Sequence, residues 1–387
     1  MILASDPRRK RLRIIAALLF ATLVAACNVS LPGGALGPRV GGGTVNVALL
    51  VPYGSAAAGD DLVARSLEQA ARLAAQDITD TEIAITVYQT AGTPAQAATQ
   101  AENAIREGAD IIVGPLRSDA AAAVSVAARG RLNVLSFSNN TEIAGGNVFV
   151  LGNTFESTAF RLVNYAASQG RSRIVILHPQ NLAGEVARDA ILTALPFAGA
   201  SLAGTVPYEF SASGVVDVLP TVMDTIRESG ANAIFITSNT TGALPLFAQL
   251  LPENGLDVTQ VQMIGMSRWD TPPQTLELAG LQGGWFALPD PGAEASFAAR
   301  YTAAYGEPPH VLAGLGYDAV QAVATAARNS GQLGASDLAA VSGVSGATGV
   351  FRLNNDGTNT RALAVAEVIE SQVSIRDPAG LSPATGF

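Results

Sequence analysis

Short polar segments follow several of the apolar runs that predict strands. Three of them are Leu116-Arg117-Ser118-Asp119, Ser138-Asn139-Asn140-Thr141 and Ser267-Arg268-Trp269-Asp270. Hydroxyl, amide and guanidinium groups can hold a polar solute by hydrogen bonding, and a guanidinium can grip a carboxylate with two parallel bonds. The chemistry that these residue types indicate is therefore recognition of a small polar or anionic group.

Each of these segments also has a simpler interpretation. Ser118 or Asp119 suits the start of a helix as a cap, and turn chemistry alone favours asparagine at positions such as 139 and 140. Arginine beside tryptophan is typical of a protein-contact hot spot. The alternative is that Asp270 neutralises Arg268 and that Trp269 belongs to the core. Both interpretations stay open from the sequence.

Further candidates lie in loops after other predicted strands. Tyr53-Gly54-Ser55 follows the first strand, where a plain turn is the alternative. Asn181 lies in the loop His178–Leu182, and Asn239 and Thr240 lie in Ser238-Asn239-Thr240-Thr241. Because the carboxyl ends of parallel strands meet at one edge of a sheet, these loops are expected to line a common cleft.

Catalytic and metal sites find little support in this composition. Cys27 is the only cysteine, and His178 and His310 are the only histidines. Zinc sites of the Cys/His kind and a cysteine nucleophile in the folded body are thereby excluded. His178 has no Gly-x-Ser-x-Gly elbow to pair with. Asn354-Asn355-Asp356-Gly357 lacks the distal glutamate of a calcium loop and predicts a hairpin turn. We expect a non-enzymatic protein without metal or cofactor.

Apolar runs alternate with helical patterns along the chain. The expected strands are 45–51, 83–88, 111–113, 132–137, 174–177, 233–237, 262–266 and 285–288. The expected helices are 62–75, 94–107, 120–129, 157–169, 184–194, 216–229, 244–251, 293–305 and 312–329. Thr93-Pro94-Ala95-Gln96 predicts a capping box at the start of the second of them. A hairpin is expected from 349–353 and 363–369. This rhythm predicts an α/β protein of two lobes, each a parallel sheet flanked by helices.

The first residues predict export. A basic stretch at 8–13 precedes an apolar run at 14–26 that ends in small residues before Cys27, the layout of a secretory signal peptide. The alternative is an uncleaved membrane anchor, but the run is shorter than the roughly 20 residues that a spanning helix needs. The end of the run, Leu23-Val24-Ala25-Ala26-Cys27, resembles the bacterial lipobox. That resemblance implies cleavage before Cys27 and acylation of its thiol. Residues 27–44 would then form the lipidated end and a flexible tether to the membrane.

Charge excludes one large class of partner. The whole chain carries a formal net charge of −9, although its first segment is basic, so the remainder is more acidic still. Nucleic acids attract Lys- and Arg-rich surfaces. We therefore expect no nucleic-acid partner.

The order of these elements is similar to that of the type I periplasmic-binding superfamily. Its segments include Val113-Gly114-Pro115-Leu116 and Gly316-Tyr317-Asp318-Ala319. The resemblance implies three crossings between lobes, near 148–153, 284–291 and 346–351. The expected domains are a signal peptide (1–26), the tether (27–44), lobe 1 (45–150 with 288–348), lobe 2 (151–287 with 349–372) and a tail (373–387).

One branch of that superfamily is the leucine-binding type, which feeds ABC importers through a permease. Resemblance to it implies that Ser118, Ser138, Asn139, Asn140 and Thr141 clamp the carboxylate of an amino-acid-like solute. The segment 238–241 lacks the carboxylate, and 178–182 the aromatic, that such receptors place there. A buried ammonium needs a counter-charge. This branch is therefore the alternative.

The other branch is the activator lipoproteins of penicillin-binding proteins (LpoA type). Short strings shared in the same order include Pro179-Gln180-Asn181, Ser267-Arg268 and Thr348-Gly349. That resemblance implies a class A penicillin-binding protein as partner and activation of peptidoglycan synthesis, and it is the preferred interpretation of the sequence. Asn28 stands where inner-membrane retention is associated with aspartate. The expected location is the outer membrane facing the periplasm, with the outer leaflet of the inner membrane as the alternative.

Overall fold

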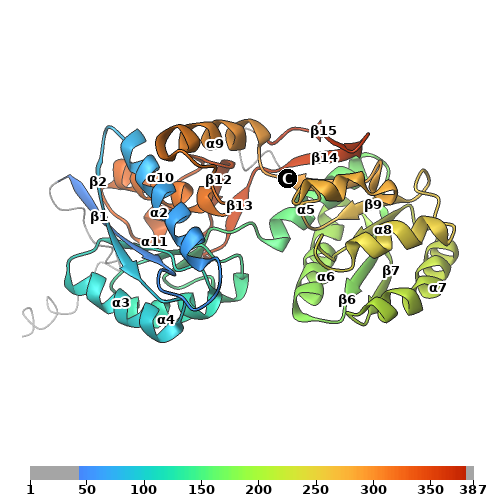
Figure 1. Ribbon diagram of the computed structural model, residues 1–387, viewed down its shortest axis with the longest axis horizontal. Helices are drawn as coiled ribbons and strands as arrows, with labels where there is room; N and C mark the ends of the chain where they lie inside the picture. The colour runs from blue at the N-terminus through green and yellow to red at the C-terminus, as the bar shows by residue number, and fades with distance from the viewer. Residues whose placement is uncertain (1–42, 381–387) are drawn as a thin grey trace, which may run out of the picture. The chain divides into compact units, whose positions relative to one another are not determined.

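The computed structural model describes residues 43–380. The expected signal peptide, the lipidation of Cys27, nearly all of the tether and the last residues of the tail lie outside this range. Within it the chain builds two α/β lobes, each around its own sheet (Figure 1). The predicted fold class is confirmed.

Lobe 1 contains a five-stranded parallel sheet in the order β2-β1-β3-β4-β5. Its strands are β1 (Thr44–Val51), β2 (Glu82–Gln89), β3 (Ile111–Val113), β4 (Val134–Ser136) and β5 (Val148–Val150). The associated helices are α2 (Asp60–Asp77), α3 (Pro94–Arg106), α4 (Ser118–Ala128), η1 (Thr141–Ile143), α9 (Pro291–Tyr305), α10 (Ala313–Ser330) and α11 (Ala335–Ala339).

The sequence explains these elements locally. Val47, Leu49 and Val51 of β1 face one core cluster while Ala48 and Leu50 face another, so the strand is apolar on both sides. The expected cap of α3 is present, because the Thr93 hydroxyl accepts a hydrogen bond from Gln96 N at 3.3 Å. The reciprocal half of a capping box does not form, since Thr93 N donates to Thr90 O instead.

Lobe 2 is built on a seven-stranded sheet in the order β15-β14-β10-β9-β8-β6-β7. Its strands are β6 (Arg173–Pro179), β7 (Ser201–Tyr208), β8 (Ala233–Ile236), β9 (Gln262–Gly265), β10 (Trp285–Leu288), β14 (Ala364–Ile369) and β15 (Gln372–Asp377). The strands β6 to β10 are parallel, and β14 and β15 add antiparallel to the edge. The helices are α5 (Phe155–Ser168), α6 (Leu182–Ala194), η2 (Leu195–Ala198), α7 (Ala212–Ser229), α8 (Leu244–Glu253), η3 (Pro273–Glu277) and η4 (Ala279–Leu281).

The end of the chain differs from expectation. Strand β12 (Gly349–Leu353) pairs with β11 (Val344–Gly346) and β13 (Asn359–Arg361), so the hairpin returns through β13 while 364–369 pairs in lobe 2. Phe351 and Leu353 are buried in the core of lobe 1. The third crossing therefore falls at 362–363 instead of 346–351, and 349–361 belongs to lobe 1. The predicted tail includes strand β15.

Close packing of helices holds lobe 1 together. Helix α10 lies directly against α2, and a Cβ on Gly316 would stand 2.3 Å from Leu67 O. A glycine is needed there because no larger residue allows the backbones to approach so closely. The same helix carries Asp318, fully buried on its inner side.

Candidate functional site

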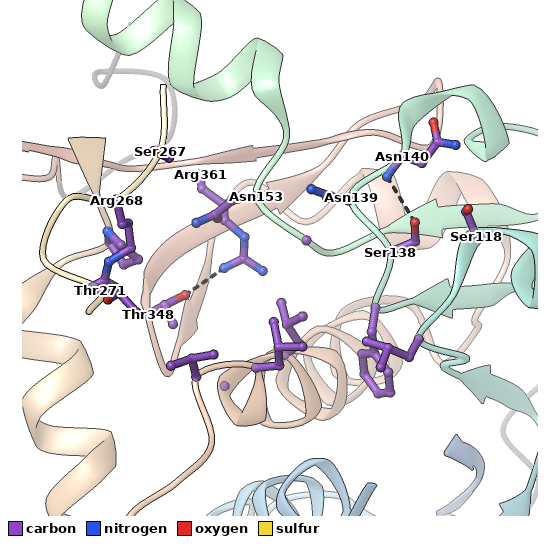
Figure 2. A pocket seen from close by; sticks show the side chains of 18 of the residues that line it. Ser118, Ser138, Asn139, Asn140, Asn153, Ser267, Arg268, Thr271, Thr348 and Arg361 are labelled. Carbon is purple, nitrogen blue, oxygen red and sulfur yellow. Dashed lines mark hydrogen bonds between the residues drawn. The ribbon is translucent and has the colours of Figure 1, made fainter. Parts of the chain in front are cut away.

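A cavity of about 790 Å³ is lined by loops of both lobes. In lobe 1, loops after β3, β4 and β5 line it together with residues of α9, α10, the β11–β12 turn and β13. In lobe 2, the lining residues follow β8, β9 and β10. Figure 2 shows Ser118, Ser138 and Asn139 on one side of it and Ser267, Arg268 and Thr271 on the other. This is the strand-end position where open α/β sheets bind ligands, and the volume suits a small molecule.

The lobe 1 wall is preorganised by hydrogen bonds within its loops. Ser138 Oγ accepts from Asn140 N at 3.0 Å, and Ser136 Oγ donates to Pro115 O at 3.0 Å beneath it (Figure 2 draws the first of these bonds). Asn140 Oδ1 caps η1 by accepting from Glu142 N. The predicted turn role of Asn140 thus coexists with a place in the cavity wall.

The first turn of α4 also reaches this cavity. Ser118 and Asp119 line it, and Arg117 at the N-cap position gives the helix no side-chain cap. Asp119 Oδ1 accepts from Ala120 N at 2.8 Å, so the uncapped amides of this turn are those of Ser118 and Asp119. Uncapped amide groups at a helix start carry partial positive charge and favour an anion. The Arg117 guanidinium is held by Asp60 at 2.9 Å and by Gly92 O at 3.2 Å.

The lobe 2 wall presents a hydroxyl without a partner. Ser267 Oγ is buried and has no hydrogen-bond partner among residues 43–380, although Ser267 lines the cavity. A buried polar group left unpaired is costly unless a ligand or water pairs with it. Thr240 differs, since its hydroxyl donates to Thr271 O at 2.9 Å. Ser267 is thus a polar group available to a solute.

Arg268 lies between two carboxylates. Its guanidinium donates to Asp270 at 2.6 and 2.9 Å and to Glu294 of α9 at 2.6 and 3.3 Å. Burial opposes the charge on the guanidinium, but the bonds to both carboxylates outweigh it and hold the pKa of Arg268 above its usual value. The predicted neutralisation by Asp270 is present, and Arg268 still lines the cavity.

Arg361 forms the third arginine of the cavity wall. It pairs with the fully buried Asp318 at 2.7 Å and donates to Leu151 O at 2.7 and 3.1 Å and to Thr348 Oγ1 at 2.9 Å. The last of these bonds is drawn in Figure 2. Burial raises the pKa of Asp318, while Arg361 opposes that shift. This pair lies where strand β13 leaves lobe 1.

The charges of the cavity are therefore largely compensated inside the protein. Arg117, Arg268 and Arg361 are each paired with carboxylates. Among the lining residues that the structure describes, Asp119 at the exposed rim is a carboxylate without an ion pair. Apolar side chains complete the lining: Leu116, Phe137, Pro289, Val311, Leu312 and Leu315.

The structure separates the predicted candidates into two groups. It brings together Arg117, Ser118, Asp119, Ser138, Asn139, Asn140, Thr240, Ser267 and Arg268 in the cavity lining. The remaining candidates are outside that lining: Tyr53, Ser55, Thr141, Asn181, Asn239 and Trp269.

Local bonds account for several residues of the second group. Asn181 Oδ1 caps α6 by accepting from Gly184 N at 2.9 Å. Tyr53 donates its hydroxyl to Glu68 at 2.9 Å. Trp269 is 0 % exposed and packs against Phe286, which corrects the expectation of a contact residue and matches the core alternative.

Sequence reasoning missed other lining residues. Asn153 and Arg361 lie next to crossings between the lobes, Thr348 lies in the turn between β11 and β12, and Glu294 lies at the start of α9. The expected hairpin of 349–353 and 363–369 was the signal that pointed near Arg361, which precedes its expected return strand. The other three carry no local motif that marks a cavity.

His178 belongs to the buried end of β6 and not to the cavity. It is 3 % exposed, and its Nδ1 lies 3.2 Å from Pro179 O. Burial lowers the pKa of His178 below its usual value. Within residues 43–380 no group of three His, Cys, Asp or Glu side chains is arranged to hold a metal ion. The side chains that line the cavity are suited to holding a solute by hydrogen bonds.

We expect His178 to make stability depend on pH. Because its pKa is depressed in the folded state, this stabilisation is present above about pH 6.5 and is lost as pH falls, by up to about 1.4 kcal/mol per pH unit. Urea unfolding between pH 7 and 5 should show a flatter dependence for His178→Asn. The exposed neighbour variant Gln180→Asn should keep the full dependence, and an equal slope in both would contradict the assignment.

No helix within residues 43–380 is both long and apolar enough to cross a membrane. A family model described as periplasmic binding protein matches residues 44–372. A search of curated proteins returned no match.

Solved structures share the fold at low sequence identity. A putative branched-chain amino acid ABC transporter protein from Rhodospirillum rubrum has a TM-score of 0.72 and 18% identity, covering 86% of this chain and 99% of its own. An ABC transporter substrate-binding protein from Desulfitobacterium hafniense in complex with Leu gives 0.63 and 20%, covering 86% and 99%. A solute binding protein from Rhodopseudomonas palustris BisB5 in complex with 3,4-dihydroxy benzoic acid gives 0.58 and 17%, covering 88% and 99%.

The family match spans most of the chain, and the two-lobed architecture agrees with it. The family match and the structures named above do not show the closeness to penicillin-binding protein activators that the sequence favoured. The chain belongs to the periplasmic binding protein family.

Proposed function

We propose that this protein is the substrate-binding component of an ABC importer and that it takes a small carboxylate-bearing solute, an amino acid or a related acid. The observation that carries the proposal is the cavity of about 790 Å³ at the strand ends, with the unpartnered Ser267 hydroxyl in its wall. The solved structures of the same fold support this class, because several are described as ABC transporter substrate-binding proteins. In the sequence analysis this function was the alternative to activation of a peptidoglycan synthase.

The carboxylate would lie at the start of α4. Ser118 and the uncapped amides there can donate to it, and the polar loop 138–140 borders the same space. The apolar body of the solute would pack on Phe137, Leu312 and Leu315, and Ser267 would bond a polar group from the side of lobe 2. Closure of the lobes around the solute is the hinge motion expected of such receptors.

The charge balance bears on the solute. Glu294 is already paired with Arg268, so Asp119 at the rim is the carboxylate left to face an ammonium. An acid without an ammonium group needs no such partner. We therefore expect acids to bind at least as tightly as the matching amino acids.

A ligand panel tests the function. The full chain in detergent would be titrated by calorimetry with leucine, 4-methylpentanoate, 3-methylbutylamine and 3,4-dihydroxybenzoate, and its melting temperature followed in parallel. Binding of an acid or an amino acid, with no binding of the amine, is the expected result. Absence of binding to every solute, together with capture of a class A penicillin-binding protein, would favour the activator function instead.

Ser267→Ala is expected to weaken solute binding. Loss of one hydrogen bond to the solute costs about 1 kcal/mol, which raises Kd roughly 3- to 10-fold. Ser213→Ala serves as the control, because Ser213 is exposed on α7 and bonds only Ser211 among described residues. An unchanged Kd in Ser267→Ala would remove this hydroxyl from the site.

The cellular location follows from the proposal. A substrate-binding component works in the periplasm, next to its permease. Acylation at Cys27 would tether it to a membrane surface, and the inner-membrane outer leaflet would then bring it closest to an importer.

A further inference from the structure

A second cavity, of about 660 Å³, shares none of the lining residues of the first. It is lined by α5 and η2 of lobe 2 and by the β12–β13 hairpin of lobe 1. We call it the hinge-side cavity, because its wall includes Asn359, whose Nδ2 donates to Val150 O and Gly152 O at 2.9 Å each, on the segment that crosses between the lobes.

Arg352 supplies a cation to this cavity. Its Nε is buried without a hydrogen-bond partner, and in the described part of the chain its guanidinium forms no ion pair. The three arginines of the first cavity are all paired with carboxylates. A partly buried arginine without a partner is costly to keep, and its planar fork suits a carboxylate.

Acceptors occupy other parts of the same lining. Asn359 is 3 % exposed, and its Oδ1 has no hydrogen-bond partner within residues 43–380. Glu156 and Asp356 also line the cavity, and neither forms an ion pair with a described residue. One oxygen of Glu156 accepts from Thr141, and one of Asp356 accepts from Thr358. Each carboxylate keeps a second oxygen for a donor.

An aromatic surface adjoins these polar groups. Phe197 is 73 % exposed and contacts Phe160, with ring centroids 5.3 Å apart and planes inclined by 54°. Both rings line the cavity. An apolar side chain of a ligand would cover part of Phe197 and gain by leaving water.

We propose that the hinge-side cavity is a second ligand site, which takes a small zwitterion with an apolar side chain, such as an aromatic amino acid. Arg352 binds the carboxylate. Asn359 Oδ1 accepts from the ammonium, and Glu156 and Asp356 supply its counter-charge. The apolar side chain packs on Phe197. This site has a free cation, which the lining of the first cavity lacks, beside two free carboxylates, so the two cavities favour different solutes.

The test uses L-phenylalanine as the probe, with 3-phenylpropionate and 2-phenylethylamine as analogues that each lack one charge. Calorimetry would be run on the full chain and on Asn139→Trp, a variant that fills the first cavity from its exposed wall. Phenylalanine is expected to bind both proteins equally, and each analogue to bind at least tenfold more weakly.

Two variants locate the site. Arg352→Gln and Phe197→Ala should each weaken phenylalanine binding at least tenfold. Arg129→Gln, which removes an exposed arginine outside both cavities, should leave it unchanged. Phe197→Ala changes an exposed ring, so it should fold normally.

The following results would overturn the second site or one of its assigned residues. No binding of phenylalanine at millimolar concentration, or undiminished binding by Arg352→Gln, would overturn the second site. Loss of binding in Asn139→Trp alone would place phenylalanine in the first cavity, which supports the proposed receptor and overturns only the second site. Equal binding of 2-phenylethylamine would overturn the assignment of Arg352.

Discussion

Replacing Asp318 with asparagine is expected to lower the free energy of unfolding by about 3–5 kcal/mol. Asp318 is 0 % exposed and pairs with Arg361, whose side chain is 3 % exposed. It also accepts from Ala347 N at 2.6 Å. The amide would leave the Arg361 charge buried without its counter-ion, and that uncompensated charge is the main cost.

Urea denaturation followed by circular dichroism measures this effect. Asp224→Asn is the matched control, since Asp224 pairs with Arg227 on the surface, with side chains 57 % and 71 % exposed. An exposed pair of this kind contributes less than about 1 kcal/mol. Equal losses in the two variants would show that burial of the Asp318 pair has no special role.

Replacing Arg268 with glutamine is expected to weaken binding of an acid in the first cavity about 100-fold. The guanidinium now neutralises Asp270 and Glu294, and its removal leaves the Glu294 carboxylate of the cavity lining facing the solute anion. With an effective dielectric constant of about 20, this repulsion amounts to about 3 kcal/mol if lobe closure brings the two charges to about 5 Å. A change of about 2.7 kcal/mol corresponds to 100-fold.

Calorimetry with the acid that binds best in the panel measures this change. Glu294→Gln should act in the opposite direction and tighten binding, because it frees one side of the guanidinium. Arg227→Gln, which removes an exposed arginine on α7, should leave Kd unchanged. Tighter binding in Arg268→Gln would exclude an anionic solute from this cavity.

Most elements of the fold could be predicted because their signals are local. The strands 111–113 and 285–288 have the bounds expected from their apolar runs, and Thr93 caps α3 as expected. Strand β7 was not expected. Its residues alternate between small, polar and apolar side chains at the sheet edge, where burial is incomplete. Strand β15, also an edge strand, has the same weak pattern, and most of it falls in the segment expected as a tail.

The candidate site could be predicted in part. Loops after β3, β4 and β9 supplied lining residues, because strand ends of a parallel sheet share one edge. Trp269 has the same composition signal as a contact residue, yet it packs under Gly265 and Gly284 in the core of lobe 2. Side-chain direction at a loop is decided by packing, which the sequence of the loop does not contain.

The sequence by itself determined the two-lobed α/β architecture, because the period of apolar residues and the turn and capping residues act over a few positions. Only the tertiary structure decided which residues share a cavity. Arg361 meets Asp318 across 43 positions, and Asn359 meets Val150 across 209. Such contacts depend on how the sheets pack and where the chain crosses between lobes, and no short stretch of sequence carries that information.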